Sequence, residues 1–245
     1  MTDDDVSRET PPVPASARGV FADRWELAVA YADLLATAGV TRGLIGPRET
    51  ARLWDRHLLN CAALTEVLPE AATVCDIGSG AGLPGLVVAI RRPDLRVTLV
   101  EPLLRRTTFL SEAVETLALD NVEVVRDRAE HLHGRRRFQV VTSRAVAPLP
   151  RLLAWSMPLV EEGGAMVAMK GSSARDEVTA AATELERWHV GAVEVLELGA
   201  NLTDPPTTVI RVEATESTRL GWEPTQQPRS QHSRGRRSQR RGRRK

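Results

Sequence analysis

The stretch 72–85, ATVCDIGSGAGLPG, constrains the fold of this chain more than any other. A short apolar run ends in a carboxylate, Asp76, and glycines follow at positions 78, 80, 82 and 85. Such glycines permit tight turns and let backbone N–H groups approach a ligand closely. Helical spacing of apolar residues resumes over 86–90. The order predicts a strand, a ligand-binding loop and the start of a helix.

The glycine spacing by itself leaves the ligand open. Gly80-x-Gly82-x-x-Gly85 matches the dinucleotide-binding fingerprint, but a second cofactor class uses a similar loop, and a tight turn without a ligand is an equal alternative. The rest of the chain has to distinguish them.

Composition indicates one main domain that is cytoplasmic. A chain of 245 residues, 42% hydrophobic, can build one sizeable core. No apolar run approaches the roughly 20 residues of a membrane-spanning helix, and the acidic N-terminus lacks the order of a signal peptide. Cys61 and Cys75 do not have metal-site spacing and are expected to be reduced core thiols, so no metal is expected.

The charge is distributed unevenly. Residues 228–245 hold eight Arg and one Lys without an acid. Removing these nine cations from the 33 basic residues leaves 24 against 32 acids, a net charge of −8 for residues 1–227. The body is acidic, and the tail is either a polyanion-binding segment or a solubilising end. Lys170 is the only lysine before the tail, which hints at a role that arginine cannot fill.

Four regions are expected: a disordered leader (1–20), a helical cap (21–70), a catalytic domain (71–214) and a disordered Arg-rich tail (215–245). The cap has helical periodicity over about 21–38 and 49–67. On the second helix, Arg52, Arg56 and Asn60 form a polar stripe, and His57 lies near the apolar face, where a structural role is a better explanation than a catalytic one.

From residue 72 strands alternate with helices, which predicts an α/β fold with a mainly parallel sheet. Seven strands are expected, at 72–77, 96–101, 122–126, 138–142, 164–169, 191–198 and 207–213. Helices are expected at 84–92, 103–118, 148–160 and 173–188. The last two strands have no helix between them and should form an antiparallel pair, which is unusual in a dinucleotide dehydrogenase domain.

Polar residues follow five successive strands. They are Asp76 with the glycine loop, Glu101, the run 127–130, the run 143–145, and Lys170 with Gly171. Because ligands bind outside the carboxyl ends of strands in such sheets, these residues are expected to form one site.

At these residues the chain resembles the ribosomal small-subunit RNA methyltransferase G family, also called glucose-inhibited division protein B. The resemblance is carried by LWDRHLLN (53–60), DIGSGAGLPG (76–85), SRA (143–145) and MKG (169–171), in this order. It implies a class I, Rossmann-like fold dependent on S-adenosylmethionine. It also implies transfer of a methyl group to N7 of one guanosine of 16S rRNA. The expected partner is that RNA or the small ribosomal subunit, and the protein is expected to be a monomer, although the sequence does not give the oligomeric state.

The resemblance assigns cofactor contacts residue by residue, to Gly78, Leu83, Ala129, Glu130 and Arg144. Three further residues are expected to contribute on physical grounds. Gly80 belongs to the same loop, Asp76 can meet the cofactor's ammonium directly or through water, and Glu101 is placed to accept both ribose hydroxyls.

The implied reaction needs no general base, because guanine N7 has a free lone pair at neutral pH. Catalysis would consist of positioning and exclusion of water. Arg144 and Lys170 are the catalytic candidates, holding phosphates or the guanine O6, while Arg56, His57 and Lys170 are the RNA-binding candidates. The alternatives are a methyltransferase acting on another RNA or a small molecule, a nicotinamide-dependent oxidoreductase, and a non-enzymatic RNA-binding module.

Overall fold

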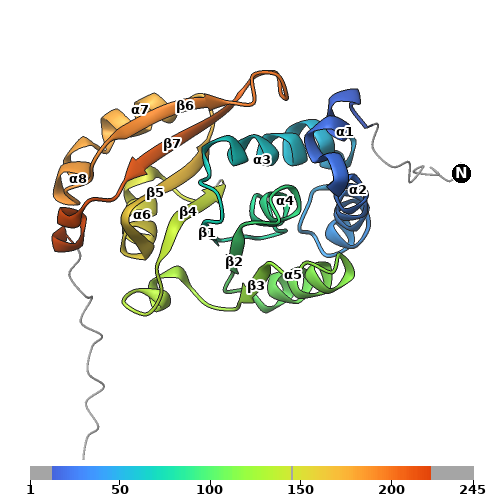
Figure 1. Cartoon of the computed structure of the whole chain (residues 1–245), viewed down its shortest axis with the longest axis horizontal. Helices are drawn as coiled ribbons and strands as arrows, with labels where there is room; N and C mark the ends of the chain where they lie inside the picture. Colours follow the sequence, from blue (N-terminus) through green and yellow to red (C-terminus); the bar gives the residue numbers. More distant parts are fainter. Residues whose placement is uncertain (1–12, 145, 222–245) are drawn as a thin grey trace, which may run out of the picture.

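The computed structural model describes residues 13–144 and 146–221 (Figure 1). Its centre is a seven-stranded sheet in the order β3-β2-β1-β4-β5-β7-β6. The strands are β1 (Thr73–Ile77), β2 (Arg96–Val100), β3 (Val122–Val125), β4 (Phe138–Arg144), β5 (Val160–Lys170), β6 (Val193–Leu198) and β7 (Thr207–Glu213). Strands β1 to β5 pair in parallel, whereas β7 is antiparallel to both β5 and β6.

Helices cover both faces of the sheet (Figure 1). The principal ones are α1 (Ala15–Phe21), α2 (Trp25–Leu34), α3 (Asn60–Ala63), α4 (Gly85–Arg91), α5 (Leu104–Thr116), α6 (Leu149–Ser156), α7 (Ala174–Ala180) and α8 (Ala182–Arg187). Shorter 3₁₀ and π segments connect them, including Pro47–Arg52, Leu53–Leu59 and Ala129–Leu132. In the described ranges, none of the helices has the length and apolar character needed to cross a membrane.

Two hydrophobic cores form because side chains alternate between the faces of a strand. Val74 and Leu99 face one core together with α1 to α5, whereas Cys75 and Val100 face the other with α6 to α8. The N-terminal helices therefore pack on the same side of the sheet as α4, and the alternation predicted from sequence produces a three-layered α/β structure.

The predicted sheet and its antiparallel end are confirmed. Two elements differ. Strand β5 begins at Val160, four residues earlier than expected, since α6 ends at Ser156 and a single 3₁₀ turn containing Pro158 leads directly into the strand. The helix expected over 173–188 is interrupted at Ala181, where ψ is near 7° instead of helical.

The boundaries of both terminal regions also need correction. Helix α1 begins at Ala15, so residues 15–20, which were expected to belong to a disordered leader, are helical. The reason is packing: Ala17 and Phe21 are buried, and Phe21 meets the edge of Trp54. At the other end, a 3₁₀ turn covers Glu216–Gly221, with Thr218 buried, inside the segment expected to be tail. Residues 1–12 and the Arg-rich stretch 228–245 lie outside the described residues.

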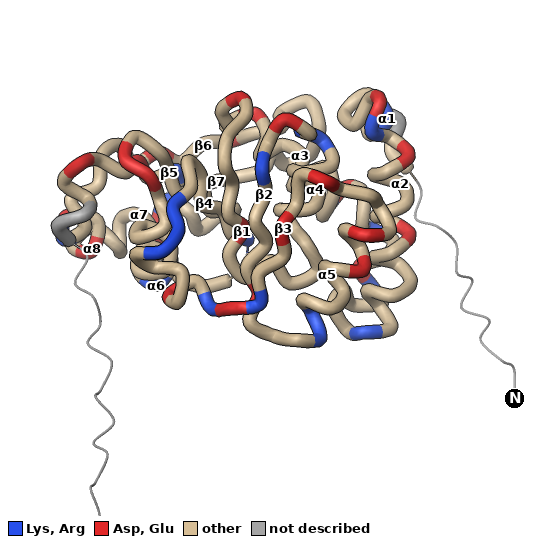
Figure 2. The backbone as a smooth tube through the Cα atoms, turned by 60° about the horizontal axis from the view of Figure 1, so that its bottom comes forward, with Lys and Arg blue, Asp and Glu red and all other residues tan. Residues whose placement is uncertain are grey.

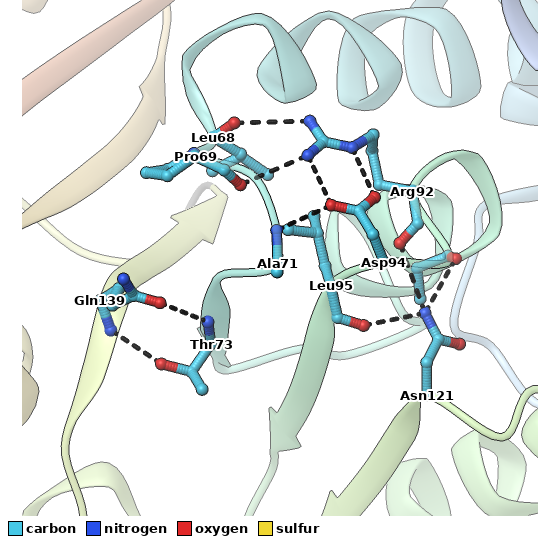
Figure 3. A network of polar contacts seen from close by, with 10 residues as sticks. Leu68, Pro69, Ala71, Thr73, Arg92, Asp94, Leu95, Asn121 and Gln139 are labelled. Carbon is cyan, nitrogen blue, oxygen red and sulfur yellow. Dashed lines mark hydrogen bonds and ion pairs between the residues drawn. The ribbon is translucent and has the colours of Figure 1, made fainter.

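Polar contacts tie together the edge of the sheet where β1, β2 and β4 begin (Figure 3). Arg92 pairs with both carboxylate oxygens of Asp94 at 2.7 Å, and Asp94 Oδ2 accepts the Ala71 N–H at 2.9 Å. Hydrogen bonds from Arg92 hold the pKa of Asp94 well below its usual value. Thr73 and Gln139 exchange two hydrogen bonds between β1 and β4. These contacts stabilise the amino ends of the three strands, and any ligand site is expected at their carboxyl ends.

Candidate active site

A cavity of about 650 Å³ opens at the carboxyl ends of β1, β2 and β4. Its size falls in the usual range for small-molecule sites. Its walls include nearly all the residues predicted to bind a cofactor, namely Gly78, Gly80, Leu83, Glu101, Ala129, Glu130 and Arg144. Residues that follow four of the five strands thus line this cavity, whereas Lys170 and Gly171, at the end of the fifth strand, line a second one.

The glycine loop has backbone conformations that favour glycine. Gly78, Gly80 and Gly82 have φ angles of 70°, 59° and 96°. A Cβ on Gly78 would come within 3.1 Å of the Val146 side chain, so Val146 packs directly on the loop. A Cβ on Gly80 would meet only the Gly78 carbonyl oxygen, at 3.8 Å. The Val146 side chain therefore covers the loop at Gly78, whereas the space beside Gly80 is open.

Asp76 lies behind this loop and not on the cavity wall. It is fully buried, and its Oδ2 accepts the Gly85 N–H at 3.0 Å at the start of α4. Its Oδ1 has no hydrogen-bond partner among the described residues. Burial raises the pKa of Asp76 to about 7. Asp76 therefore lies beneath the loop, where Oδ2 holds α4 against β1, and a contact of Oδ1 with a ligand, directly or through water, stays a prediction.

Glu101 is also buried and already accepts several hydrogen bonds. Its Oε1 accepts the Leu103 N–H at 3.0 Å, and its Oε2 accepts the Gly80 N–H at 3.1 Å and an Arg106 N–H at 3.3 Å. A carboxylate can accept about four hydrogen bonds, so these three leave Glu101 about one position for a ligand. Accepting two ribose hydroxyls, as expected from sequence, would require Arg106 to move away.

Arg144 and His57 meet across two elements far apart in the chain. An Arg144 Nη2–H donates to His57 Nδ1 at 2.8 Å, and His57 Nε2 lies 2.9 Å from Glu49 Oε2. His57 is only 8% exposed. Burial lowers the pKa of His57, and the positive charge of Arg144 lowers it further. Sequence reasoning placed both residues in the site but did not predict their contact.

A second cavity, of about 1470 Å³, adjoins the first, and Arg144 and Val146 line both. Arg52, Arg56 and Arg175 line the second cavity alone. All three are exposed, and neither Arg52 nor Arg175 is ion-paired within residues 13–144 and 146–221. Basic and acidic positions are interspersed along the rest of the described chain (Figure 2). The predicted RNA-binding residue Arg56 thus lies in a different cavity from His57.

Lys170 lines the second cavity but is not available to a ligand in this arrangement. Its ammonium donates to Glu177 Oε2 at 2.6 Å and to the Ala147 carbonyl at 2.9 Å, and its side chain is 8% exposed. The contact with Ala147 holds the segment that carries Val146. Lys170 is therefore placed as a support for the wall between the two cavities. Ala145, in the same segment, lies outside the described residues.

Several wall residues were not found from the sequence. Ile45 and Leu44, from the Gly/Pro-rich break in the N-terminal extension, close over the first cavity, and Trp155 reaches it from α6. Apolar residues in a loop carry no functional signal before the fold is known. Among the described residues, no three His, Cys, Asp or Glu side chains gather as a metal site would need.

Two solved structures share this fold at low sequence identity. One is an S-adenosylmethionine-dependent O-methyltransferase from Thermotoga maritima, with a TM-score of 0.51 and 13% identity over 64% of each chain. The other, from Methanococcus maripaludis, is described as an S-adenosylmethionine-dependent methyltransferase, with a TM-score of 0.55 and 11% identity over 76% of this chain and 94% of that one. The fold is thus that of the class I methyltransferases.

Sequence relatives identify the group within this class. The family model for rRNA small subunit methyltransferase G matches residues 24–203. A "Ribosomal RNA small subunit methyltransferase G" from a Nocardioides species is 62% identical over 98% of this chain and 99% of its own length. One from Streptomyces avermitilis is 58% identical over 85% and 88%. The chain belongs to the rRNA small subunit methyltransferase G family, which confirms the resemblance and replaces the oxidoreductase alternative.

Proposed function

We propose that this chain uses S-adenosylmethionine to methylate N7 of one guanosine in 16S rRNA, nucleotide 527 in the usual numbering. The observation that carries the proposal is the pair of adjoining cavities that share Arg144. One is walled by the glycine loop and suits a small cofactor, and the other is wider and lined by exposed arginines. Family membership supports both assignments.

The residues of the first cavity fit S-adenosylmethionine. Gly78 and Gly80 would present backbone at its methionine end, Glu101 would accept from its ribose, and Ala129 and Glu130 would border its adenine. The unpaired Oδ1 of Asp76 lies beneath the same loop, and a bound cationic ligand would favour the ionised form of this carboxyl group. When bound, this cofactor supplies an electrophilic methyl group on a sulfonium.

The second cavity is proposed to take the RNA. Arg52, Arg56 and Arg175 are exposed cations suited to phosphate oxygens. Arg144 lies between the two cavities, where its guanidinium can contact the target nucleotide. A guanosine stacked in RNA would have to turn out of its stack to reach this place. Lys170 would contribute by supporting the wall and not by contacting RNA.

No proton has to be removed from guanine N7 during the reaction, because that atom reacts through its lone pair. Its own residues would position the base and exclude water, terms that can supply about 7–11 kcal/mol when reactants are held in attack geometry. His57, held neutral by its surroundings, is not needed as a base. Action as a monomer, in the cytoplasm and on small-subunit rRNA, belongs to the same proposal.

The test is methyl transfer by the full-length protein to small ribosomal subunits from cells that lack this modification. Labelled S-adenosylmethionine should yield one methyl group per subunit, and cleavage at N7-methylguanosine should map it to a single position of 16S rRNA. Calorimetry should show binding of S-adenosylmethionine and not of NAD. Transfer to a small molecule, or to a different RNA, would contradict the proposal.

A further inference from the structure

The Arg144 side chain is held almost entirely by the N-terminal helical extension. Its guanidinium donates to His57 Nδ1 at 2.8 Å, to the Arg56 carbonyl at 3.2 Å and to Cys61 Sγ at 3.5 Å. All three acceptors come from residues 56–61, whereas Arg144 is the last residue of β4. The extension, and not the catalytic sheet, therefore determines where this cation points.

His57 is the strongest of these acceptors, and its protonation state follows from its partners. Arginine has only donors, so His57 Nδ1 must carry a lone pair toward Arg144. The ring proton is then on Nε2, which faces Glu49 Oε2 at 2.9 Å. Only the neutral Nε2–H tautomer satisfies both contacts at once.

The charges around His57 agree with this state. Glu49 faces the ring from the 3₁₀ segment Pro47–Arg52, Arg144 from β4, and Arg56 is its neighbour in the chain. Burial and Arg144 lower the pKa of His57, while the hydrogen bond from His57 lowers the pKa of Glu49. At neutral pH the Glu49 carboxylate, the neutral His57 imidazole and the Arg144 guanidinium thus form one hydrogen-bonded series.

We propose that His57, oriented by Glu49, is a positioning residue that fixes the Arg144 guanidinium at the boundary between the cofactor cavity and the RNA cavity. This differs from the direct RNA contact expected for His57 from sequence, and it rests on the proposed function of the two cavities. Groups that orient a functional side chain through its far hydrogen bonds commonly matter nearly as much as the side chain itself.

The test is a double-mutant cycle on the full-length protein with S-adenosylmethionine and unmodified small subunits. His57→Phe keeps a planar ring but removes both nitrogens, and should lower kcat/KM by at least about tenfold, since a misplaced group can cost up to about 100-fold. In an Arg144→Ala background the same substitution should cost less than about twofold, because nothing remains to be positioned. Equal losses in both backgrounds would overturn the proposal, as would no loss in either.

Glu49 offers a second pair of variants that leave the hydrophobic core intact, because its side chain is one-third exposed. Glu49→Ala removes the acceptor for His57 Nε2–H and should lower kcat/KM, whereas Glu49→Gln keeps an acceptor and should recover most of the loss. Failure of Glu49→Gln to recover it would contradict an orienting role through this hydrogen bond.

The matched control is Glu123→Gln. Glu123 Oε2 accepts a hydrogen bond from Arg136 Nη2 at 2.6 Å, and neither residue lines either of the two cavities. Its kcat/KM should equal that of the unaltered protein at similar melting temperature. If the unaltered protein transfers no methyl group to the subunit, the proposed function fails. If it does and the cycle shows additive losses, only the positioning role fails.

Discussion

The Tyr31 hydroxyl donates a 2.8 Å hydrogen bond to the carbonyl oxygen of Ala81, in the middle of the glycine loop. Tyr31 is on α2 and fully buried, and burial raises its pKa well above 10.0, so the phenol remains a donor at all working pH values. Ala81 lines the cofactor cavity. The N-terminal extension therefore holds the loop at one side of the cavity, as it holds Arg144 at the other.

Tyr31→Phe should weaken the loop without emptying the core, because only the hydroxyl is lost. We expect the free energy of unfolding to fall by about 0.5–1.5 kcal/mol, the usual contribution of one hydrogen bond. Affinity for S-adenosylmethionine should fall with it, since Ala81 is no longer held. Urea unfolding and calorimetry measure the two effects. Unchanged affinity in a destabilised variant would mean that the bond serves folding alone.

Gly78→Ala should reduce cofactor affinity, and Gly163→Ala is its control. Both glycines have positive φ, 70° and 75°, so alanine brings similar backbone strain at the two positions. A Cβ at Gly78 would press on Val146 within 3.2 Å, whereas one at Gly163 meets nothing within 4 Å. Both variants should lose stability through backbone strain, Gly78→Ala somewhat more because of the contact with Val146, but only Gly78→Ala should bind S-adenosylmethionine more weakly. Equal affinities would show that the loop is only a turn.

Asp76 should make stability depend on pH in an unusual direction. Burial raises its folded-state pKa to about 7 from 3.8, so the folded protein keeps a proton that the unfolded chain releases over this range. The contribution of Asp76 to stability is greatest below about pH 4 and declines toward pH 7, by up to about 1.4 kcal/mol per pH unit.

Asp76→Asn should remove this part of the pH dependence, since the amide oxygen can still accept the Gly85 N–H. The measurement is the free energy of unfolding of both proteins at several pH values between about 4 and 7. Parallel curves for the two proteins would rule out the raised pKa.

Lys170→Met should act on the wall between the cavities. The variant loses charge-assisted hydrogen bonds to Glu177 and the Ala147 carbonyl, which should lower the free energy of unfolding by about 1.5–3 kcal/mol. Methyl transfer should fall as well, because the segment carrying Val146 is no longer held. Chemical denaturation and kinetics test this together. A variant that kept full stability but lost transfer would instead indicate direct contact between Lys170 and RNA.

Deletion of residues 228–245 should flatten the salt dependence of RNA binding. This segment carries nine cations without an acid and lies outside the described residues, so the prediction rests on charge alone. If half of the charges met phosphates, the log–log slope would change by roughly three, using about 0.7 per contact. Affinity for S-adenosylmethionine should not change. Replacement of the arginines by lysine, which keeps the charge, should preserve the slope, and an unchanged slope after deletion would exclude phosphate binding.

Much of the fold could be predicted from the sequence because its determinants are local. The apolar run before Asp76, the glycines after it and the missing helix between β6 and β7 specify a strand, a loop and an antiparallel pair through neighbouring residues alone. The carboxyl ends of parallel strands share an edge by geometry, which is why Gly78 and Glu101 could be placed together. Local spacing did not reveal the buried Ala17, which belongs to a helix that begins six residues before the expected start at Phe21.

The roles of individual side chains depended on tertiary contacts. The Arg144 contact with His57 spans 87 residues, and that of Tyr31 with Ala81 spans 50. Neither pair has a spacing that sequence periodicity can report. The contacts of Lys170 with Glu177 and the Ala147 carbonyl likewise depend on how α7 packs on the end of β5, which residue spacing does not show. Sequence by itself determined which residues reach the site edge. Only tertiary packing, by the N-terminal extension at Arg144, by α4 at Asp76 and by α7 at Lys170, decided which of them line a cavity and which hold neighbouring segments in place.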